Sequence, residues 1–302
     1  MGKVKNYLSL IKFSHTIFAM PFALIGFVLG ITQLHPMDTP VIPGWHATIY
    51  TKEFLLFKFF LVIGCMIFAR SAAMAFNRWL DASYDKKNLR TSTREIPSGI
   101  IKPNNALWFV ILSCIAFILC CWFINILCFY LSFVALFVIL FYSYTKRFTA
   151  LCHLILGIGL SLAPIGAYLA VTGSFNFLPI IFSLTVLSWV SGFDIIYALQ
   201  DEEFDKAQQL HSIPAAIGKK NALRISELLH FLSIACVVYA GLFGHFGAYY
   251  WIGVAVFMGL LIYQHLLVKP NDLSKVNMAF FTTNGIASVV FAVFVLLDLF
   301  LK

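Results

Sequence analysis

Two pairs of aspartates in this 302-residue sequence share one spacing, Asp81 with Asp85 and Asp201 with Asp205. Residues four apart on a helix lie on one face, so each pair would present two carboxylates side by side, and Asn77 would extend the first pair by one turn. Oxygen ligands of this kind suit Mg²⁺, which takes a few carboxylates together with substrate phosphate oxygens. One pair alone is more readily explained as a solvated helix end. Its repetition favours a metal site made of Asn77, Asp81, Asp85, Asp201 and Asp205.

A further acid, Asp194, lies seven residues before Asp201, which is about two helical turns. It stands at the edge of an apolar run, where an unpaired acid is costly and usually functional. The chain has only 13 acidic residues, and six of them are Asp81, Asp85, Asp194, Asp201, Glu202 and Asp205. Such a concentration at two matching helix ends indicates chemistry. We take as candidate catalytic residues Asp81, Asp194 and Asp201.

Several cations accompany these acids along the chain. Arg90 and Arg94 follow the first motif, and Lys146 and Arg147 end a long apolar run. Arginine forks onto phosphate oxygens and lysine supplies a point charge, so we assign Arg94, Lys146 and Arg147 to phosphate binding. The alternative is that they anchor the chain at the cytosolic membrane surface.

Arg70 differs from these cations because it lies inside an apolar run. It precedes Asn77 by seven residues, which places it on the same helical stripe but deeper, and we assign it to substrate binding. A guanidinium inside the membrane needs an anionic partner. Two partners remain open, which are Asp194 in an internal ion pair and the carboxylate of a substrate.

Together these residues indicate a diphosphate held by Mg²⁺ at the mouth of an apolar cavity. An allylic diphosphate leaves readily when a metal and cations take up its developing charge. The resulting carbocation needs a water-free pocket with aromatic faces nearby. Tyr142, Tyr144 and Tyr197 lie where they could serve, and we assign Tyr144 and Tyr197 to substrate binding. Each of them taken singly fits the interfacial aromatic belt better.

The composition indicates which elements must hold these residues. Hydrophobic residues make up 61% of the chain and charged residues 11%, whereas a soluble domain has about 45–50% and about 25%. A core cannot absorb that excess, so the lipid bilayer must be the solvent for much of the surface. The formal charge of +8 follows membrane topology, and we expect no nucleic-acid partner.

Apolar stretches long enough to cross a bilayer, which takes about 20 residues, recur along the whole chain. They predict an all-α, polytopic bundle of about nine transmembrane helices in one domain, 1–302, with spans at 14–34, 54–76, 106–124, 126–144, 151–171, 177–198, 225–243, 248–268 and 279–300. The motifs follow the second and sixth spans, which suggests a duplicated four-helix unit. Lysine and arginine gather in the loops on one side. By the positive-inside rule the N-terminus and both motifs are cytosolic, in a multi-pass protein of the inner, cytoplasmic membrane.

At these motifs the sequence resembles the UbiA family of intramembrane aromatic prenyltransferases. The resemblance covers essentially the whole chain and rests on Asn77-x-x-x-Asp81-x-x-x-Asp85, Arg94-Glu-Ile-Pro-Ser-Gly99, Tyr144-Thr-Lys-Arg-Phe148, and Gly192-Phe-Asp-Ile-Ile-Tyr-Ala-Leu-Gln-Asp201 with Asp205. It implies that the aspartate motifs hold Mg²⁺ and a polyprenyl diphosphate, and that an aromatic acid acceptor is prenylated in the central cavity. It also implies that the diphosphate is contacted by Arg94, Lys146 and Arg147.

The first and last predicted helices resemble the 4-hydroxybenzoate polyprenyltransferase branch, which implies prenyl transfer to 4-hydroxybenzoate or a similar acid in quinone biosynthesis. Asn77-Arg78 and His211-Ser-Ile-Pro214 resemble members of the futalosine route, which would prenylate 1,4-dihydroxy-6-naphthoate for menaquinone. Arg78 replaces an acid and His211 a basic residue that are common in the family, which affects metal and diphosphate binding. Haem farnesylation is a further alternative within the family. A membrane transporter, with paired charges near the middle of the bilayer, is the alternative outside it.

Overall fold

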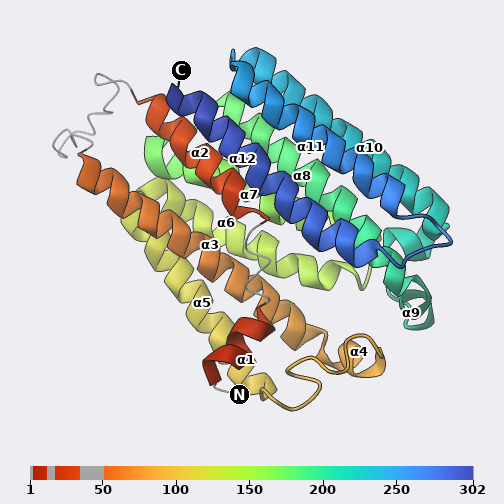
Figure 1. Ribbon diagram of the computed structural model, residues 1–302. Coiled ribbons are helices and arrows are strands. Elements are labelled where there is room, and N and C mark those ends of the chain that lie inside the picture. The colour runs from red at the N-terminus through yellow and green to blue at the C-terminus, as the bar shows by residue number, and fades with distance from the viewer. Residues whose placement is uncertain (1–2, 12–17, 35–50, 302) are drawn as a thin grey trace.

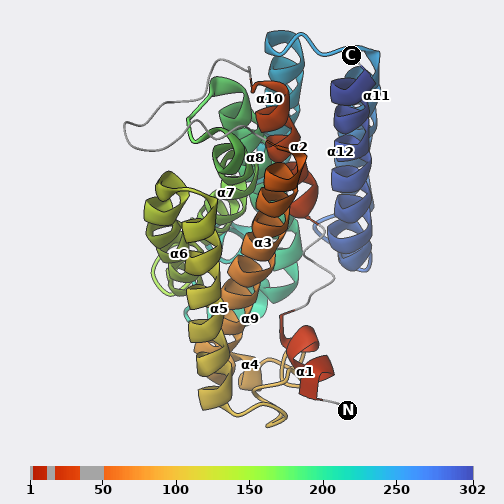
Figure 2. The same cartoon turned by 90° about the vertical axis from the view of Figure 1, so that its left-hand side faces the viewer.

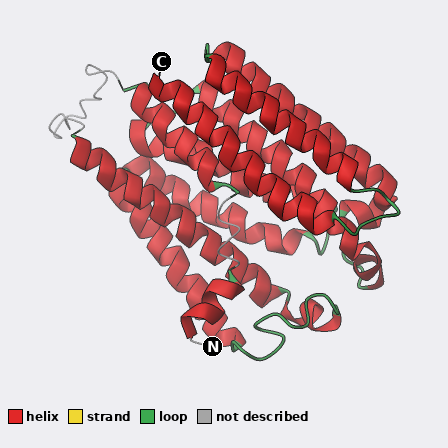
Figure 3. Cartoon of the chain, in the orientation of Figure 1, coloured by secondary structure: helices red, strands yellow, loops and turns green. Residues whose placement is uncertain are grey.

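The fold is built from helices joined by loops and turns (Figure 3). The structure is a computed structural model that describes residues 3–11, 18–34 and 51–301, and in this part the strand content is an isolated bridge between Lys269 and Asp272. The elements are α1 (Lys3–Leu10), α2 (Met20–Thr32), α3 (Lys52–Leu80), α4 (Ala82–Lys87), α5 (Pro103–Ile124), α6 (Ile126–Thr145), α7 (Cys152–Thr172), α8 (Phe177–Ala198), the 3₁₀ turn η2 (Leu199–Asp201), α9 (Glu202–Ala207), α10 (Ile213–Phe243), α11 (Ala248–Leu267), the π-helical η3 (Met278–Thr283) and α12 (Asn284–Leu301).

The described helices confirm a polytopic membrane bundle. Eight of them are long and apolar enough to cross a membrane, and α2 is a shorter apolar helix of 13 residues. The first predicted span, 14–34, begins at positions 14–17, which lie outside the described residues. The other eight predicted spans each coincide with one of the long helices. The largest difference is α10, which begins at Ile213 and contains a kink at Gly218 (φ 77°, ψ 163°).

The central helix is α8, which packs between α7 and α10 (Figure 1). Its Trp189 is fully buried, with its ring centroid 5.9 Å from that of Phe257 on α11. Figure 2 shows α5 and α6 on one side of the bundle and α11 and α12 on the other. The backbones of α7 and α8 approach closely at Gly157, where an added Cβ would lie 2.6 Å from the carbonyl oxygen of Leu187. This contact brings the first turn of α7 against α8.

Both aspartate motifs lie where a membrane helix breaks. Asp81 (φ −93°, ψ 7°) separates α3 from α4, and Asp201 (φ −102°, ψ 4°) ends the 3₁₀ turn between α8 and α9. The stripe expected from Asn77 to Asp85 is therefore interrupted at Asp81, although the Asp85 N–H still donates to the Asp81 carbonyl at 2.8 Å. Figures 1 and 2 both show α4 and α9 toward the end of the bundle that carries α1. Equivalent breaks at both motifs support the predicted repetition of the four-helix unit.

At the opposite end of the bundle, α12 caps α11. The residue that precedes α11, Gly247, has no side chain to accept hydrogen bonds from the first turn. Asp298 of α12 supplies the acceptors: its Oδ2 accepts from the Gly247 N–H at 2.8 Å and its Oδ1 from the Tyr250 N–H at 3.3 Å. Asp298 is only 3% exposed, so these bonds are shielded from water. A carboxylate from another helix thus takes the place of an ordinary N-cap side chain.

We expect Asp298→Ala to lower the free energy of unfolding by about 1–3 kcal/mol, because two backbone donors lose their partner in a buried position. Thermal unfolding of the purified protein in detergent measures the effect. The matched control is Asp298→Asn, which keeps one acceptor oxygen and should melt between the wild type and the alanine variant. Equal melting temperatures for all three proteins would contradict the capping role.

Candidate active site

A cavity of about 1030 Å³ opens between α3, α6, α7 and α8 and runs from the two motifs into the apolar interior. Its deeper wall is made of residues such as Cys65, Ala135 and Ala163. The predicted site residues that line it are Arg70, Asn77, Asp81, Asp85, Arg94, Lys146, Arg147, Asp194, Tyr197, Asp201 and Asp205. Segments far apart in the sequence therefore line one cavity, which has a polar mouth and an apolar interior.

The first motif forms one side of the cavity mouth. Asn77 Nδ2 donates to Asp81 Oδ2 at 3.0 Å, and Arg147 Nη2 lies 3.2 Å from Asp81 Oδ1. Arg94 Nη1 donates to both oxygens of Asp85, at 2.7 and 2.9 Å. Burial raises the pKa of Asp81, and the nearby Arg147 guanidinium acts against that rise. Each carboxylate of this motif thus has its own arginine.

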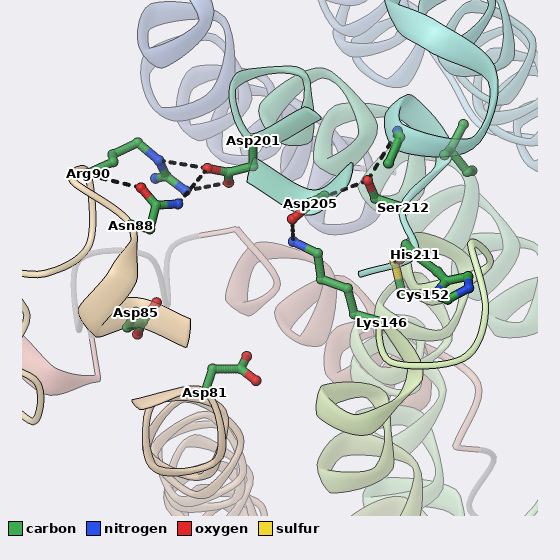
Figure 4. A network of polar contacts seen from close by, with 12 residues as sticks. Asp81, Asp85, Asn88, Arg90, Lys146, Cys152, Asp201, Asp205, His211 and Ser212 are labelled. Carbon is green, nitrogen blue, oxygen red and sulfur yellow. Dashed lines mark hydrogen bonds and ion pairs between the residues drawn. The ribbon is translucent and has the colours of Figure 1, made fainter. Parts of the chain in front are cut away.

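The second motif forms the other side and is held more tightly (Figure 4). Asp205 is fully buried, with Oδ1 2.7 Å from Lys146 Nζ and Oδ2 accepting from Ser212 Oγ at 2.8 Å. The guanidinium of Arg90 forks onto both oxygens of Asp201 and donates from Nη1 to the Tyr197 hydroxyl at 2.9 Å. This motif is therefore enclosed by side chains from three separate segments.

Every motif carboxylate is paired with a different cation. The pairs are Asp81–Arg147, Asp85–Arg94, Asp201–Arg90 and Asp205–Lys146. Burial alone would lower the pKa of Lys146 and of Arg90, but the adjacent carboxylates outweigh it and raise both pKa values. Both cations therefore stay charged at the cavity mouth.

The donor set of this mouth fits Mg²⁺ shared with a diphosphate. Carboxylate and amide oxygens are the ligands that Mg²⁺ prefers, and Mg²⁺ completes its shell with water and substrate phosphate oxygens rather than with protein groups alone. Among the described residues no three acids, histidines or cysteines are gathered closely enough to hold a metal by themselves. The arrangement is consistent with carboxylates on two sides of a bound diphosphate rather than with a preformed cage.

Arg70 lies deeper in the cavity and has no polar partner among the described residues. The ion pair with Asp194 that the sequence left open is not formed, because Asp194 Oδ2 lies 2.7 Å from Nδ1 of His153 instead. Arg70 makes no hydrogen bond or ion pair with any described residue, and its Nε is buried without an acceptor. An unpaired guanidinium in an apolar wall is a site for an anionic group of a ligand.

The two tyrosines assigned to substrate binding lie in different places. Tyr197 lines the cavity, but Tyr144 does not: it is 40% exposed, and its ring lies 6.0 Å from that of Phe76 and 5.4 Å from the Arg147 guanidinium. Tyr142 lines the cavity in its stead. Two positions along a helix are about 200° apart around its axis, so Tyr142 and Tyr144 cannot both face inward.

Several residues that line the cavity were not assigned from the sequence, and four of them bear on the site: Arg78, Asn88, Arg90 and His153. Arg90 and Asn88 bind Asp201, and their position shortly after the first motif was the available signal. Arg78 is buried at 4% exposure in the cavity wall with Nη1 unpartnered, and His153 gave no signal because a lone histidine beside an apolar run is ordinary. His211, in contrast, does not line this cavity; it lines a separate hollow of about 570 Å³ that Arg147 also lines.

We expect Lys146→Met to destabilise the protein by about 3 kcal/mol, because Asp205 would keep a buried charge without its cation. This value is toward the lower end for a broken buried ion pair, since the Lys146 side chain is about a third exposed. Thermal unfolding without Mg²⁺ measures the loss. The double variant Lys146→Met with Asp205→Asn should regain most of it, since the amide oxygen can still accept from Ser212. As a surface control, Lys87→Met removes a lysine bonded to Gln208 and should melt like the wild type. A Lys146→Met protein as stable as this control would refute the pairing.

Residues 39–286 match the UbiA prenyltransferase family. The chain is 32% identical over 230 residues to a 4-hydroxybenzoate octaprenyltransferase of Francisella tularensis subsp. novicida, covering 75% of this chain and 79% of that protein. It is 33% identical over 236 residues to a protein of the same name from Nitrosospira multiformis, covering 78% and 80%.

Solved structures have the same fold. A UbiA homolog from Aeropyrum pernix K1 superposes with a TM-score of 0.76 at 24% identity, covering 95% of this chain and 97% of that one. A UbiA homolog from Archaeoglobus fulgidus, bound to GPP and Mg²⁺, superposes with a TM-score of 0.69 at 20% identity, covering 97% and 99%. The family match over most of the sequence, with curated relatives above 30% identity, shows that this chain belongs to the UbiA prenyltransferase family.

Proposed function

We propose that the protein transfers a polyprenyl group from a polyprenyl diphosphate to 4-hydroxybenzoate, or a similar hydroxylated aromatic acid, in quinone biosynthesis. The observation that carries the proposal is one cavity with carboxylates and cations at its mouth and an unpaired Arg70 in its apolar wall. The curated relatives are named 4-hydroxybenzoate octaprenyltransferases, and the Archaeoglobus fulgidus homolog was solved with GPP and Mg²⁺. Both support the same donor and acceptor classes here.

The diphosphate site consists of the two motifs and their cations. Asp81, Asp85, Asp201 and Asp205, with the Asn77 amide oxygen, would hold Mg²⁺ and through it the diphosphate. When bound, the metal neutralises charge that develops on the leaving diphosphate. The same cations that now pair with the carboxylates would then turn to phosphate oxygens: Arg90, Arg94, Lys146 and Arg147. Because each of these cations already lies beside a carboxylate of the mouth, the exchange would need only side-chain rotations.

The acceptor site lies deeper. Arg70 precedes Asn77 by seven residues, so it lies roughly 10 Å further along α3. Its guanidinium would bind the acceptor carboxylate, which directs the ring toward the cavity body. Tyr142 and Tyr197 contribute aromatic faces to the wall, where they stabilise an allylic cation and help to exclude water.

A closely related acceptor is 1,4-dihydroxy-6-naphthoate, which also carries one carboxylate but has two ring hydroxyls. Arg70 would bind either acid, and Arg78 adds a second guanidinium without a partner for Nη1 in the same wall. Asn77-Arg78 is also the pair that resembles members of the futalosine route, and this resemblance is the reason to test the naphthoate beside the benzoate.

For the arrangement in the cell, we propose a single domain in the inner, cytoplasmic membrane with the N-terminus and both motifs on the cytosolic side. The support is the distribution of charge: Arg90, Arg94, Lys146 and Arg147 all lie at one end of the bundle, together with the motifs. A water-soluble diphosphate headgroup and an aromatic acid would both reach the mouth from that side.

We expect membranes that contain the protein to form a prenylated aromatic acid when given Mg²⁺, octaprenyl diphosphate and 4-hydroxybenzoate or 1,4-dihydroxy-6-naphthoate. Mass analysis of the extracted lipid measures the product and identifies the acceptor. Asp81→Ala and Asp201→Ala should each abolish it, because each removes a carboxylate from one side of the diphosphate. The control is Glu203→Ala, an exposed acid of α9 outside the cavity lining, which should keep full activity. Full activity of either aspartate variant would rule out the diphosphate site.

Arg70 generates a separate prediction about acceptor choice. The wild type should use 4-hydroxybenzoate at least tenfold better than its methyl ester, since the loss of a charged hydrogen-bonding partner typically removes about 1.5–3 kcal/mol. Arg70→Met should erase that preference by lowering kcat/KM for the acid, with little change in KM for the prenyl diphosphate. Competition between acid and ester in one reaction gives the ratio directly. A preference that survives in Arg70→Met would place the carboxylate elsewhere.

A further inference from the structure

A buried histidine holds Asp194, an acid of the cavity wall that lies outside both motifs. His153 stands in the first turn of α7, and its side chain is 4% exposed. Its Nδ1 lies 2.7 Å from Oδ2 of Asp194 on α8. Its Nε2 lies 3.4 Å from the backbone nitrogen of Ile213, the first residue of α10. Three helices therefore fix one imidazole ring.

The hydrogen bonds assign the tautomer of this ring. A backbone N–H such as that of Ile213 can only donate, so Nε2 of His153 accepts, and the proton of the neutral ring is on Nδ1. Nδ1–H then donates to Oδ2 of Asp194, whose carboxylate is the acceptor. The backbone of the same turn is also anchored, because Ser191 Oγ donates to the His153 carbonyl at 3.2 Å. His153 is thus a rigid donor aimed at one oxygen of Asp194.

The other oxygen of Asp194 is available to a ligand. Oδ1 has no hydrogen-bond partner among the described residues, the side chain is 23% exposed, and it lines the cavity. Asp194 precedes Asp201 by seven residues, just as Arg70 precedes Asn77. Both groups therefore lie roughly 10 Å deeper than the motifs, at the depth proposed for the acceptor.

We propose that Asp194 accepts the ring proton of the aromatic acceptor, and that His153 is the positioning residue that keeps its carboxylate turned toward that proton. The proposal rests on the proposed function, because it names a group that acts on the acceptor.

Prenyl transfer to the acceptor ring breaks two bonds and forms one new carbon–carbon bond. The bond between the allylic carbon and the diphosphate oxygen breaks, and its electron pair leaves with the diphosphate. The ring carbon beside the hydroxyl uses a π electron pair to bond to the allylic carbon. The C–H bond at that ring carbon then breaks, its electrons restore the aromatic ring, and the proton passes to Oδ1 of Asp194. After the products leave, water that enters through the cavity mouth takes the proton from Asp194.

The test uses the full-length protein purified in detergent, with Mg²⁺, octaprenyl diphosphate and the accepted acid, either normal or deuterated at the ring carbon beside the hydroxyl. His153→Leu removes the donor. His153→Asn places an amide N–H where Nδ1 stands and is the matched control. Loss of positioning should lower kcat of His153→Leu on the order of 10²-fold and leave KM for the prenyl diphosphate unchanged. Asp194→Asn removes the base itself and should cost about 10²–10⁴-fold in kcat.

The ring-deuterium isotope effect separates positioning from a purely structural role. It should be larger in His153→Leu than in the wild type, because proton removal becomes slow. In His153→Asn the isotope effect should return toward the wild-type value, and kcat should recover with it. Two results, each with an active wild type, would overturn this proposal alone. In the first, His153→Leu keeps its kcat. In the second, His153→Leu loses kcat but its isotope effect does not change. A wild type that prenylates no acid would overturn the proposed function, and this assignment with it.

Discussion

Two adjacent residues at the end of α6 hold the two halves of the site together. Lys146 reaches Asp205 of the second motif at 2.7 Å, whereas Arg147 reaches Asp81 of the first motif at 3.2 Å and also donates to the Leu80 carbonyl at 3.0 Å. The backbone at these residues is held as well, because the Lys146 carbonyl accepts a hydrogen bond from the His211 N–H at 2.7 Å. One short segment therefore sets the distance between carboxylates that are more than a hundred residues apart in the chain.

This constraint matters because the acids are partly or fully removed from water. A buried carboxylate without a partner is strongly destabilising, so the distribution of cations decides where each motif can stand. The cations for the second motif come from the first half of the sequence, Arg90 for Asp201 and Lys146 for Asp205. At the breaks in the helices, Asp81 faces Arg147 and Asp201 faces Arg90. Under the proposed function the same cations serve twice. They first neutralise the motif carboxylates in the folded protein, and they then bind the diphosphate. Diphosphate binding therefore changes the partners of these cations.

The sequence was sufficient for the features that follow from periodicity and local chemistry. Long apolar runs fix the membrane helices, and the scarcity of acids makes the two motifs stand out, so nearly all site residues expected from the sequence do line one cavity. Choices among competing partners were not predictable. The sequence offered Arg70 as a partner for Asp194, but the close approach of α7 to α8 at Gly157 brings His153 beside Asp194 instead. Whether Tyr142 or Tyr144 faces inward depended on the rotation of α6 about its axis, which an all-round apolar helix does not reveal.

The depth of the unpaired groups explains why a charged acceptor would enter an apolar cavity at all. Moving a carboxylate out of water is costly, and leaving the Arg70 guanidinium unpaired in the wall is costly as well. The two free-energy costs cancel in part only when the acid binds the guanidinium. An acceptor without a carboxylate gains no such interaction roughly 10 Å below the motifs. His153 keeps Asp194 from filling that place as a counter-ion to Arg70. Under the two proposals, the same hydrogen bond that holds Asp194 for the ring therefore also keeps Arg70 free for the carboxylate.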